Sequence, residues 1–510
     1  MGTEHVKTRI CLYLDRSRVF RWHLWLADTL AAIPAYDISI GFAPDTHPLP
    51  KYCFVLFGLE RFVYGRQGRS AIDVVDDILR PGRPGQGPFN TVIDFSLTNH
   101  PLPDCDRILV PCFNGMPGEI GAITGLFDDG PLSVEILDNT RKSPWFSTSW
   151  TASPATTDRH IFVRGLDNLL SCAVGMIVKA LAKPSIPGER RQIAGGSNPP
   201  MWALLNKASA TVIRKVVRQI DKVVSGDRQW SVGWRISSTS LLDRWIAKFA
   251  VLTDDRDHYF ADPFPVRHHG EDFIFMEQFC YASGRGRIAV TKITDNRPDR
   301  ATVVIDQPYH LSYPFIFEDD GEFWMIPEAG ASRGIDLYRA EKLPYRWKWE
   351  GRLLNNIDGY DATISRHAGR LWMFVCERMW KSSSWDELSL FSSDCLTGPW
   401  RPHPDNPILF DAALCRPGGA MFVHNGDMMR PVQDCSRLYG GALSLCRVDT
   451  VDGNFSQTLR GIIHAGDLGC HTYNNYAGLE VIDIFGRARD VKNGFPYVTA
   501  YYSPEKTNAG

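Results

Sequence analysis

The chain has 510 residues and a formal net charge of −2 at pH 7. It is too long for one ordinary core and has no basic excess for a phosphate backbone, so we expect two or three domains and no nucleic-acid partner. No apolar run reaches the roughly eighteen residues of a membrane span, and the N-terminus lacks a secretory pattern, which predicts a cytoplasmic protein without a transmembrane segment. The twelve cysteines form no CxxC pair, so neither a metal site nor a disulfide framework is expected, and no cofactor is indicated.

Residues 1–184 alternate short apolar runs, such as RICLYLD and NTVIDFSL, with helix-like stretches, such as RVFRWHLWLADTLAAI. Buried strands that alternate with helices predict a Rossmann-like α/β domain. Residues 185–229 begin with a stretch rich in Gly, Pro and Ser and continue with apolar residues at helical spacing. We interpret them as a linker and a connecting helix.

A repeat begins after residue 230. The glycines Gly270, Gly321, Gly369 and Gly426 lie in similar alternating stretches and are 51, 48 and 57 residues apart. Repeats of this length that contain several strands each are typical of a β-propeller, in which one repeat forms one blade. A fifth blade is assembled from residues 455–484, closed by the early strand WSVGWRI at 230–236. The prediction is therefore an all-β five-bladed propeller over 230–490, followed by a tail at 491–510.

Each of these glycines is predicted to mark a hairpin tip, and polar residues stand at fixed distances around it. Asp262, Tyr313, Asp361 and Gly418 lie eight residues before the glycines, and Glu277, Glu328, Glu377 and Asp434 lie seven or eight residues after them. Residues equally far from a tip oppose each other, so Asp262 should face Glu277 and Asp361 should face Glu377. With the first strand of each blade innermost, the acids form a ring around the axis, and Arg416, Arg430 and His310 are nearby partners. The alternative is that each acid caps its own blade by accepting backbone N–H groups.

Seven motifs then follow one another in order: FADPFPV, HLSYPFIF, MIPEAG, DATIS, GPWRPHPDNP, RPGGA and RPVQDCSRLYG. Together they resemble the N-terminal propeller of glucosamine inositolphosphorylceramide transferases and their bacterial relatives, over roughly residues 230–485. More distantly, they are similar to the five-bladed propellers of the family 43 and family 32 glycosidases. The plant transferases carry a separate glycosyltransferase domain after the propeller, and transfer by such a domain is not expected here.

The glycosidase resemblance implies roles for the acids. Asp262 matches the base or nucleophile, and Asp361 matches the acid that stabilises the transition state and tunes pKa values. Glycosyl chemistry also needs a carboxyl that protonates the leaving oxygen, for which Glu377, Glu328 and Asp434 are the candidates. Glu377 and Glu328 join Asp262 and Asp361 as predicted catalytic residues. The predicted substrate-binding residues are Glu277, His310, Tyr313, Arg416, Arg430, Gln433, Asp434 and His471.

The N-terminal region more faintly resembles formyltransferase domains, in which an Asn and a His precede a Ser-Leu-Leu-Pro-like stretch. Asn99 and His100 stand in TNHPLPD, but HPLP also occurs at residues 47–50, so the motif is weak. The stretch PCFNGMPGEIG is interpreted as a turn after a strand. Trp385, in the polar loop KSSSWDEL, is the candidate platform for a sugar ring.

The resulting hypothesis is a carbohydrate-active enzyme that binds a saccharide or glycolipid in the propeller funnel. Glycosyl transfer in glycan or glycolipid synthesis is favoured, and hydrolysis of a glycosidic bond is the first alternative. The second alternative is a non-catalytic module that binds a glycan and presents it to another enzyme. A carboxyl of raised pKa would favour the enzyme, whereas acids that are all bonded to Arg416, Arg430 and backbone N–H groups would favour the binding module.

Overall fold

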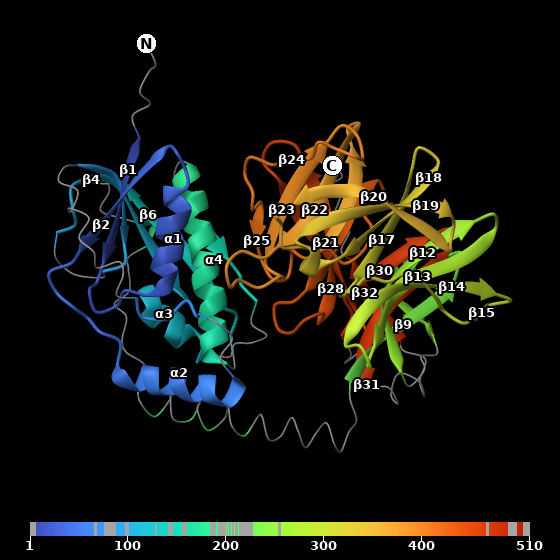
Figure 1. Cartoon of the computed structure of the whole chain (residues 1–510), viewed down its shortest axis with the longest axis horizontal. Helices are drawn as coiled ribbons and strands as arrows, with labels where there is room; N and C mark the ends of the chain where they lie inside the picture. Colours follow the sequence, from blue (N-terminus) through green and yellow to red (C-terminus); the bar gives the residue numbers. More distant parts are fainter. Residues whose placement is uncertain are drawn as a thin grey trace, which may run out of the picture. The chain divides into compact units, whose positions relative to one another are not determined.

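A computed structural model gives the structure of the chain, which divides into two compact units (Figure 1). The first comprises Met1–Gln219 and Met379–Ser383, and the second comprises Ile220–Arg378 and Ser384–Gly510. The described residues are 7–65, 69–75, 88–96, 101–127, 130–140, 146–155, 161–183, 190–191, 228–252, 257–465, 469–487 and 497–502, with single residues at 200, 202, 206, 209 and 213. Most of the predicted connecting helix and of the predicted tail therefore lies outside the described residues.

The N-terminal unit contains a mixed sheet of strand order β2-β1-β3-β4-β6-β7-β8. The first four strands are parallel to one another, as predicted for a Rossmann-like domain, and the last three continue the sheet in antiparallel fashion. The strands are β1 (Thr8–Leu14), β2 (Tyr36–Phe42), β3 (Phe89–Asp94), β4 (Cys105–Phe113), β5 (Met116–Pro117, paired with β4), β6 (Val134–Thr140), β7 (Phe146–Ala152) and β8 (Arg190–Arg191). The helices of this unit are α1 (Arg21–Ala31), α2 (Lys51–Tyr64), α3 (Gly118–Gly125) and α4 (Phe162–Ala182).

Helix α4 is long and apolar enough to cross a membrane, by length and composition alone. Within the N-terminal unit, however, 72% of its most apolar window is buried, because the helix packs on β6, β7 and α1 (Figure 1). The central helix of a folded domain has the same composition, since all of its faces meet other apolar surfaces.

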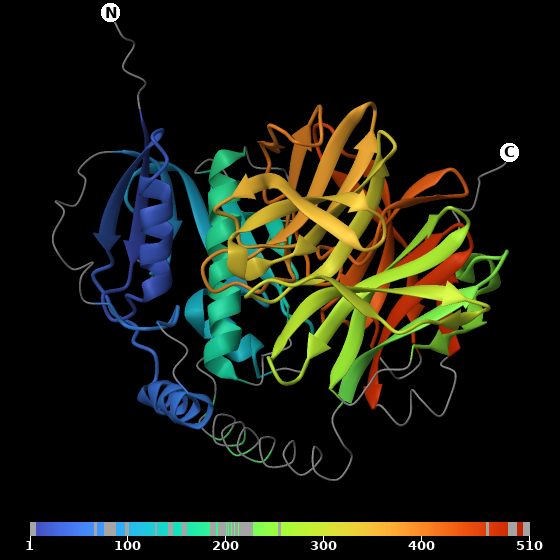
Figure 2. The same ribbon diagram turned by 45° about the vertical axis from the view of Figure 1, so that its right-hand side comes forward.

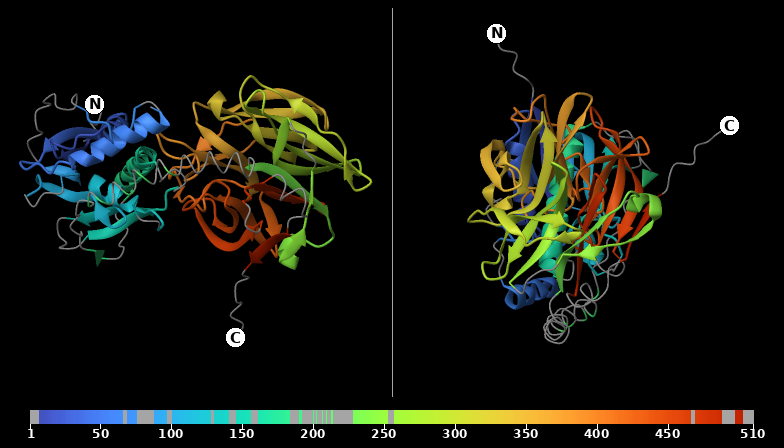
Figure 3. Two further views of the ribbon diagram at one scale, coloured as in Figure 1. Left: turned by 90° about the horizontal axis from the view of Figure 1, so that it is seen from below. Right: turned by 90° about the vertical axis from the view of Figure 1, so that its right-hand side faces the viewer.

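The second unit is built from five separate sheets, which confirms the five-bladed propeller (Figure 3). Blade one is β12 (His258–His268), β13 (Glu271–Cys280), β14 (Arg285–Thr294), β15 (Arg297–Pro298) and β16 (Thr302–Ile305); blade two is β17 (Ser312–Asp319), β18 (Glu322–Glu328), β19 (Gly334–Lys342) and β20 (Arg346–Asn355). Blade three is β21 (Gly359–His367), β22 (Arg370–Glu377), β23 (Glu387–Ser393), β24 (Arg401–Pro402) and β25 (Leu409–Phe410). Blade four is β26 (Phe422–His424), β27 (Asp427–Asp434), β28 (Ala442–Thr450), β29 (Ser456–His464), β32 (Tyr497–Tyr502) and β10 (Ile246–Lys248); blade five is β30 (Tyr473–Tyr476), β31 (Leu479–Arg487), β9 (Arg228–Ile236) and β11 (Ala250–Val251).

Strand β9 closes the ring, as predicted. All nine residues of β9 pair with β31, from Arg228 opposite Arg487 to Ile236 opposite Leu479, and the two ends of the domain lie side by side in Figure 2. One boundary was wrong. Residues 456–464 belong to blade four rather than to blade five, because β29 pairs with β28 along most of its length.

The predicted hairpin tips are confirmed. Gly270, Gly321, Gly369 and Gly426 have φ values of 79°, 77°, 80° and 88°. Each follows a residue that also has positive φ, which is the geometry of the tight turns that join antiparallel strands.

Candidate active site

The innermost strands of blades one, two and three carry a bulge at the same place. Pairing is irregular between Ala261 and Phe264, between Ser312 and Phe315, and between Tyr360 and Thr363. Asp262, Tyr313 and Asp361 lie inside these bulges with φ values of 50°, 40° and 51°. Residues other than glycine rarely adopt this conformation, and when they do they often belong to functional sites.

The bulges also change which residues oppose each other. Glu377 pairs with Gly359 instead of Asp361, and Glu277 pairs with Ala261, next to Asp262. The expectations that Asp262 faces Glu277 and that Asp361 faces Glu377 were therefore wrong. In blade one the bulge alone shifts the register by one residue. In blade three the two-residue tip at Ala368 and Gly369 already places Glu377 one position away from Asp361, and the bulge adds a second shift.

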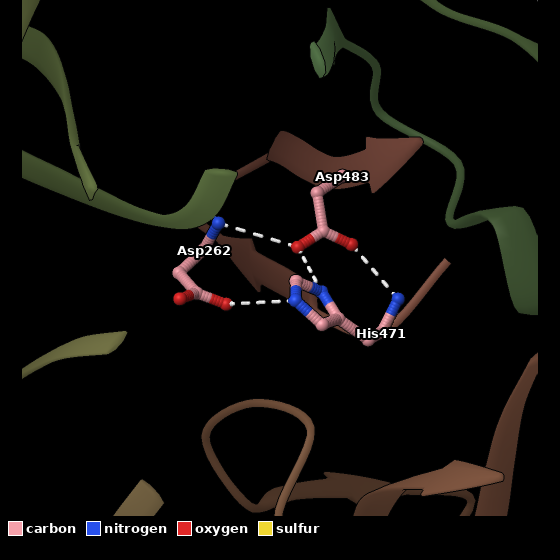
Figure 4. Close-up of side chains that lie close together, drawn as sticks. All are labelled: Asp262, His471 and Asp483. Carbon is pink, nitrogen blue, oxygen red and sulfur yellow. Dashed lines mark hydrogen bonds and ion pairs between the residues drawn. The ribbon is translucent and has the colours of Figure 1, made fainter. Parts of the chain in front are cut away.

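Asp262 meets two residues of blade five, His471 and Asp483 (Figure 4). Its backbone N–H donates to Asp483 Oδ2 at 3.2 Å, and its Oδ1 lies 3.6 Å from His471 Nε2. His471 forms an ion pair with Asp483 through Nδ1. The carboxylate of Asp262 also accepts hydrogen bonds from Thr472 Oγ1 at 2.9 Å and from the Tyr313 N–H at 3.0 Å.

Burial sets the charges of this group. Burial lowers the pKa of His471, but Asp483 and Asp262 outweigh that effect, so the pKa is raised overall and the imidazolium is favoured. Burial raises the pKa of Asp262, and His471 opposes the rise. Trp230 stacks on the His471 ring with centroids 3.9 Å apart and planes 9° apart, which fixes the ring between the two acids.

These three side chains could also ligate a metal ion. One ligand atom from each of Asp262, His471 and Asp483 lies within 4.8 Å of the others. The ion pair with Asp483 already engages His471 Nδ1, so a metal would be left with Nε2 and the carboxylate oxygens.

Asp361 is held by blade four. Its Oδ2 accepts hydrogen bonds from Arg416 Nε and Gln433 Nε2, both at 2.6 Å. Arg416 also lies 3.7 Å from Glu328 Oε2, and Glu328 accepts hydrogen bonds from Ser312 Oγ at 2.9 Å and the Gly330 N–H at 3.2 Å. Burial raises the pKa of Asp361, and Arg416 opposes the rise.

An aromatic pair borders this arginine. Trp385 and Tyr439 stack with centroids 5.2 Å apart and planes 29° apart, and the Arg416 guanidinium lies 5.2 Å from the centre of the Tyr439 ring. The predicted sugar platform thus lies beside the acid cluster.

Glu277 and His310 form the last pair. Glu277 is 5% exposed, and its Oε1 lies 3.5 Å from His310 Nε2. Burial and the charges of Asp262 and Glu328 raise the pKa of Glu277 well above its usual value. Residues from all five blades therefore meet in one cluster, which we define as Asp262, Glu277, Glu328, Asp361, Arg416, Gln433, His471 and Asp483.

Comparison with known proteins agrees with the motifs. Residues 246–460 match the family model described as "Glucosamine inositolphosphorylceramide transferase 1, N-terminal". The family resemblance is confirmed over this range. Glucosamine inositolphosphorylceramide transferase 1 from Oryza sativa subsp. japonica is 32% identical over 197 residues, which cover 38% of this chain and 26% of that protein. The protein of the same name from Arabidopsis thaliana is 29% identical over 199 residues, with the same coverage. The match thus spans about a quarter of the length of these relatives.

Several solved structures resemble the chain at low identity. A thermostable family-43 glycoside hydrolase is 13% identical with a TM-score of 0.31, over 39% of this chain and 74% of that one. A family 117 glycoside hydrolase from Zobellia galactanivorans is 13% identical with a TM-score of 0.33, over 53% and 93%. The assignment of a five-bladed propeller rests on the five sheets and not on these likenesses.

Four predicted site residues of the propeller do not place their side chains in the cluster: three bond to other partners, and the side chain of the fourth is buried in the core. Arg430 donates to the carbonyl oxygens of Leu414 and Cys415 and to the Gln457 side chain. Asp434 accepts hydrogen bonds from Ser436, and Glu377 accepts one from Ser389 Oγ at 2.7 Å. The fourth, Tyr313, contributes its N–H to Asp262, but its side chain is fully buried and its hydroxyl contacts Thr363 and the Gly419 N–H.

The sequence analysis missed Asp483 and Thr472. Asp483 stands in the otherwise apolar run VIDIF and is fully buried. A lone acid inside an apolar strand was the available signal, because burying an unpaired carboxylate is costly. In the N-terminal unit, Asn99 and His100 lie outside the described residues, while Asn114 and Gly115 turn the chain between β4 and β5, as predicted.

Proposed function

We propose that the propeller is a carbohydrate-active enzyme that acts on a glycosidic bond, with glycosyl transfer in glycolipid synthesis as the favoured reaction. The observation that carries the proposal is the pair of acids at equivalent bulges, Asp262 and Asp361, which share one buried cluster yet have different partners. Enzymes that act on glycosidic bonds need carboxyls in different roles. The relatives are named glucosamine inositolphosphorylceramide transferases, which supports a glycolipid substrate.

The partners of Asp262 suit a base or nucleophile. Two hydrogen-bond donors and an imidazolium face its carboxylate, and each of them favours the charged form that chemistry of this kind requires.

The partners of Asp361 suit a fixed charge. Arg416 and Gln433 hold one carboxylate oxygen, so the group is ordered before substrate binds. A preorganised carboxylate stabilises the positive charge that develops on the sugar in the transition state.

The state of the remaining acids favours an enzyme over a binding module. Arg430 does not reach the cluster, and Glu277 combines a raised pKa with an oxygen that accepts no hydrogen bond from the described residues. A module that only binds sugar has no use for a carboxyl held in this state.

The test compares the parent protein with Asp262→Asn, Asp361→Asn and the control Asp394→Asn, an exposed acid whose carboxylate bonds to Arg370. The assay mixes the full chain with glycosylated inositolphosphorylceramide and a panel of glycosides, and mass spectrometry detects new or cleaved glycosidic bonds. We expect the first two variants to lose turnover by roughly 10²-fold or more with unchanged melting temperature, and the control to keep it. Full activity in both Asn variants would remove the catalytic assignment, and saccharide binding without turnover in the parent would favour the binding module.

A further inference from the structure

Glu277 is a buried acid with an unused oxygen. Its side chain lies on β13 with 5% of the residue exposed, and Oε1 accepts no hydrogen bond within the part of the chain that the structure describes. A buried carboxyl oxygen without a partner is expensive. The nearest donor is the His310 ring at 3.5 Å, so the oxygen suits a neutral, protonated carboxyl better than a carboxylate.

The fold keeps space for this oxygen. A Cβ atom on Gly286, in the neighbouring strand β14, would lie 2.3 Å from Glu277 Oε1 and 2.5 Å from the Leu311 carbonyl oxygen. Glycine is thus required here by the close approach of the acid and the backbone.

Gly286 also orients His310. Its N–H donates to His310 Nδ1 at 2.9 Å, so the neutral ring carries its proton on Nε2, the atom that lies 3.5 Å from Glu277 Oε1. The His310 side chain is 42% exposed. It therefore connects the buried acid with solvent.

The surroundings of the pair suit a sugar. The Phe279 ring lies 6.1 Å from the His310 ring, and Tyr259 stacks on Phe279 at 4.8 Å, so aromatic rings stand beside the acid. The groups that face Glu277 are otherwise negative: Asp262, Glu328, Asp483 and Asp361 all act to keep it protonated, in addition to its burial.

We propose that Glu277 is the proton donor to the leaving oxygen and that His310 positions its carboxyl. This inference rests on the proposed function. As the bond between the anomeric carbon and the leaving oxygen breaks, its electron pair stays on that oxygen, which takes the Glu277 proton. The acceptor hydroxyl bonds to the anomeric carbon and gives its proton to the Asp262 carboxylate. After the product leaves, Glu277 takes a proton from water and Asp262 releases one to solvent.

The proposal also specifies the donor class. A sugar or lipid hydroxyl is a poor leaving group and needs a proton, whereas a nucleotide diphosphate does not. In the described cluster, four carboxyls besides the protonated Glu277 stand against the guanidinium of Arg416 and the imidazolium of His471, a balance that repels an anionic diphosphate. The donor is therefore a glycoside with a neutral hydroxyl leaving group.

The first experiment needs no substrate. Infrared difference spectra of the full chain at neutral pH, parent minus Glu277→Gln, should show the carbonyl band of one protonated carboxylic acid. The control is Glu271→Gln on the same strand, whose carboxylate lies 2.5 Å from Lys292 Nζ and should contribute no such band. If the parent and Glu277→Gln share the same acid bands, Glu277 is ionised and the proposal is overturned, whatever the activity of the protein.

The second experiment uses the leaving group as the variable. On aryl glycosides, Glu277→Gln should lower kcat by roughly 10²–10⁴-fold for poor leaving groups and far less for activated ones. His310→Asn should shift the alkaline limb of the pH profile of kcat. Equal losses across the series would overturn the proposal. Undiminished turnover in Asp262→Asn would instead remove the proposed function itself, and the infrared result would still report the state of Glu277.

Discussion

At the scale of single residues, the same side chain takes different roles according to its partners. Asp262 and Asp361 occupy matching bulges, but one faces an imidazolium and a hydroxyl, and the other faces a guanidinium and an amide. The spacing of the repeat was sufficient to find both acids. It could not supply Thr472 and Asp483, which are 210 and 221 positions away from Asp262, because no local pattern connects blade one with blade five.

His471 should make stability depend on pH. Its pKa is raised in the folded state by Asp483 and Asp262, so its contribution is fully present below the unfolded value of 6.5 and is lost as the pH rises through the folded value. His471→Gln leaves two buried acids without their cation and should lower the free energy of unfolding by roughly 3–5 kcal/mol at pH 6, with a smaller loss at higher pH. Urea unfolding across this range tests the prediction, with the exposed His367→Gln as control. A loss that is independent of pH would contradict it.

At the scale of elements, the hairpins were predictable and their bulges were not. A tip needs positive φ, and glycine at a fixed spacing indicates it. A bulge changes which residues pair across the two strands. It does not change the number of residues between the acid and the glycine in the sequence, so the spacing cannot reveal it. The bulge and the two-residue tip at Ala368 and Gly369 each contribute one position, which is why Glu377 was placed opposite Asp361 although it pairs with Gly359.

Gly369, at the tip of blade three, and Gly351, on β20 of blade two, offer a matched pair of substitutions. A Cβ atom on Gly369 or on Gly351 would meet nothing within 4 Å, but Gly369 has a φ of +80° and Gly351 lies outside that region. Gly369→Val should therefore destabilise the protein by about 1–2 kcal/mol through backbone strain alone, and Gly351→Val should not. Thermal unfolding of both variants measures the difference. Equal melting temperatures would show that the tip conformation costs nothing.

At the scale of the whole molecule, the propeller is a ring whose first strand completes its last blade. The repeat predicted four of the blades because each has its own hairpin glycine, and the fifth was assembled from residues 455–484. In the structure, the hairpin of blade five turns at Gly478, which has a φ of 86°. The boundary between blades four and five was harder to place, since outer strands such as β29 lie at the surface and carry little apolar pattern.

Ring closure predicts which fragments fold. A fragment of residues 225–510, which retains β9, should unfold cooperatively, because it includes every strand of the five sheets. A fragment of residues 240–510 removes β9 and exposes the edges of β31 and β11, so it should aggregate. Circular dichroism and size-exclusion chromatography of the two fragments make the comparison. If the shorter fragment were monomeric and equally stable, β9 would not be needed for closure.

The same closure has a consequence for biosynthesis. Arg235, on the first strand, forms an ion pair with Glu480 across 245 positions of chain. While the ribosome produces the first four blades, β9 can pair with the short strand β11, but its other edge stays open, and only the emergence of β31 can cover that edge. A premature stop in blade five would thus leave a nearly complete propeller whose ring cannot close, because β9 has no β31 to pair with. Chaperone dependence during synthesis should therefore persist until the final stretch of translation and end once β31 has paired with β9.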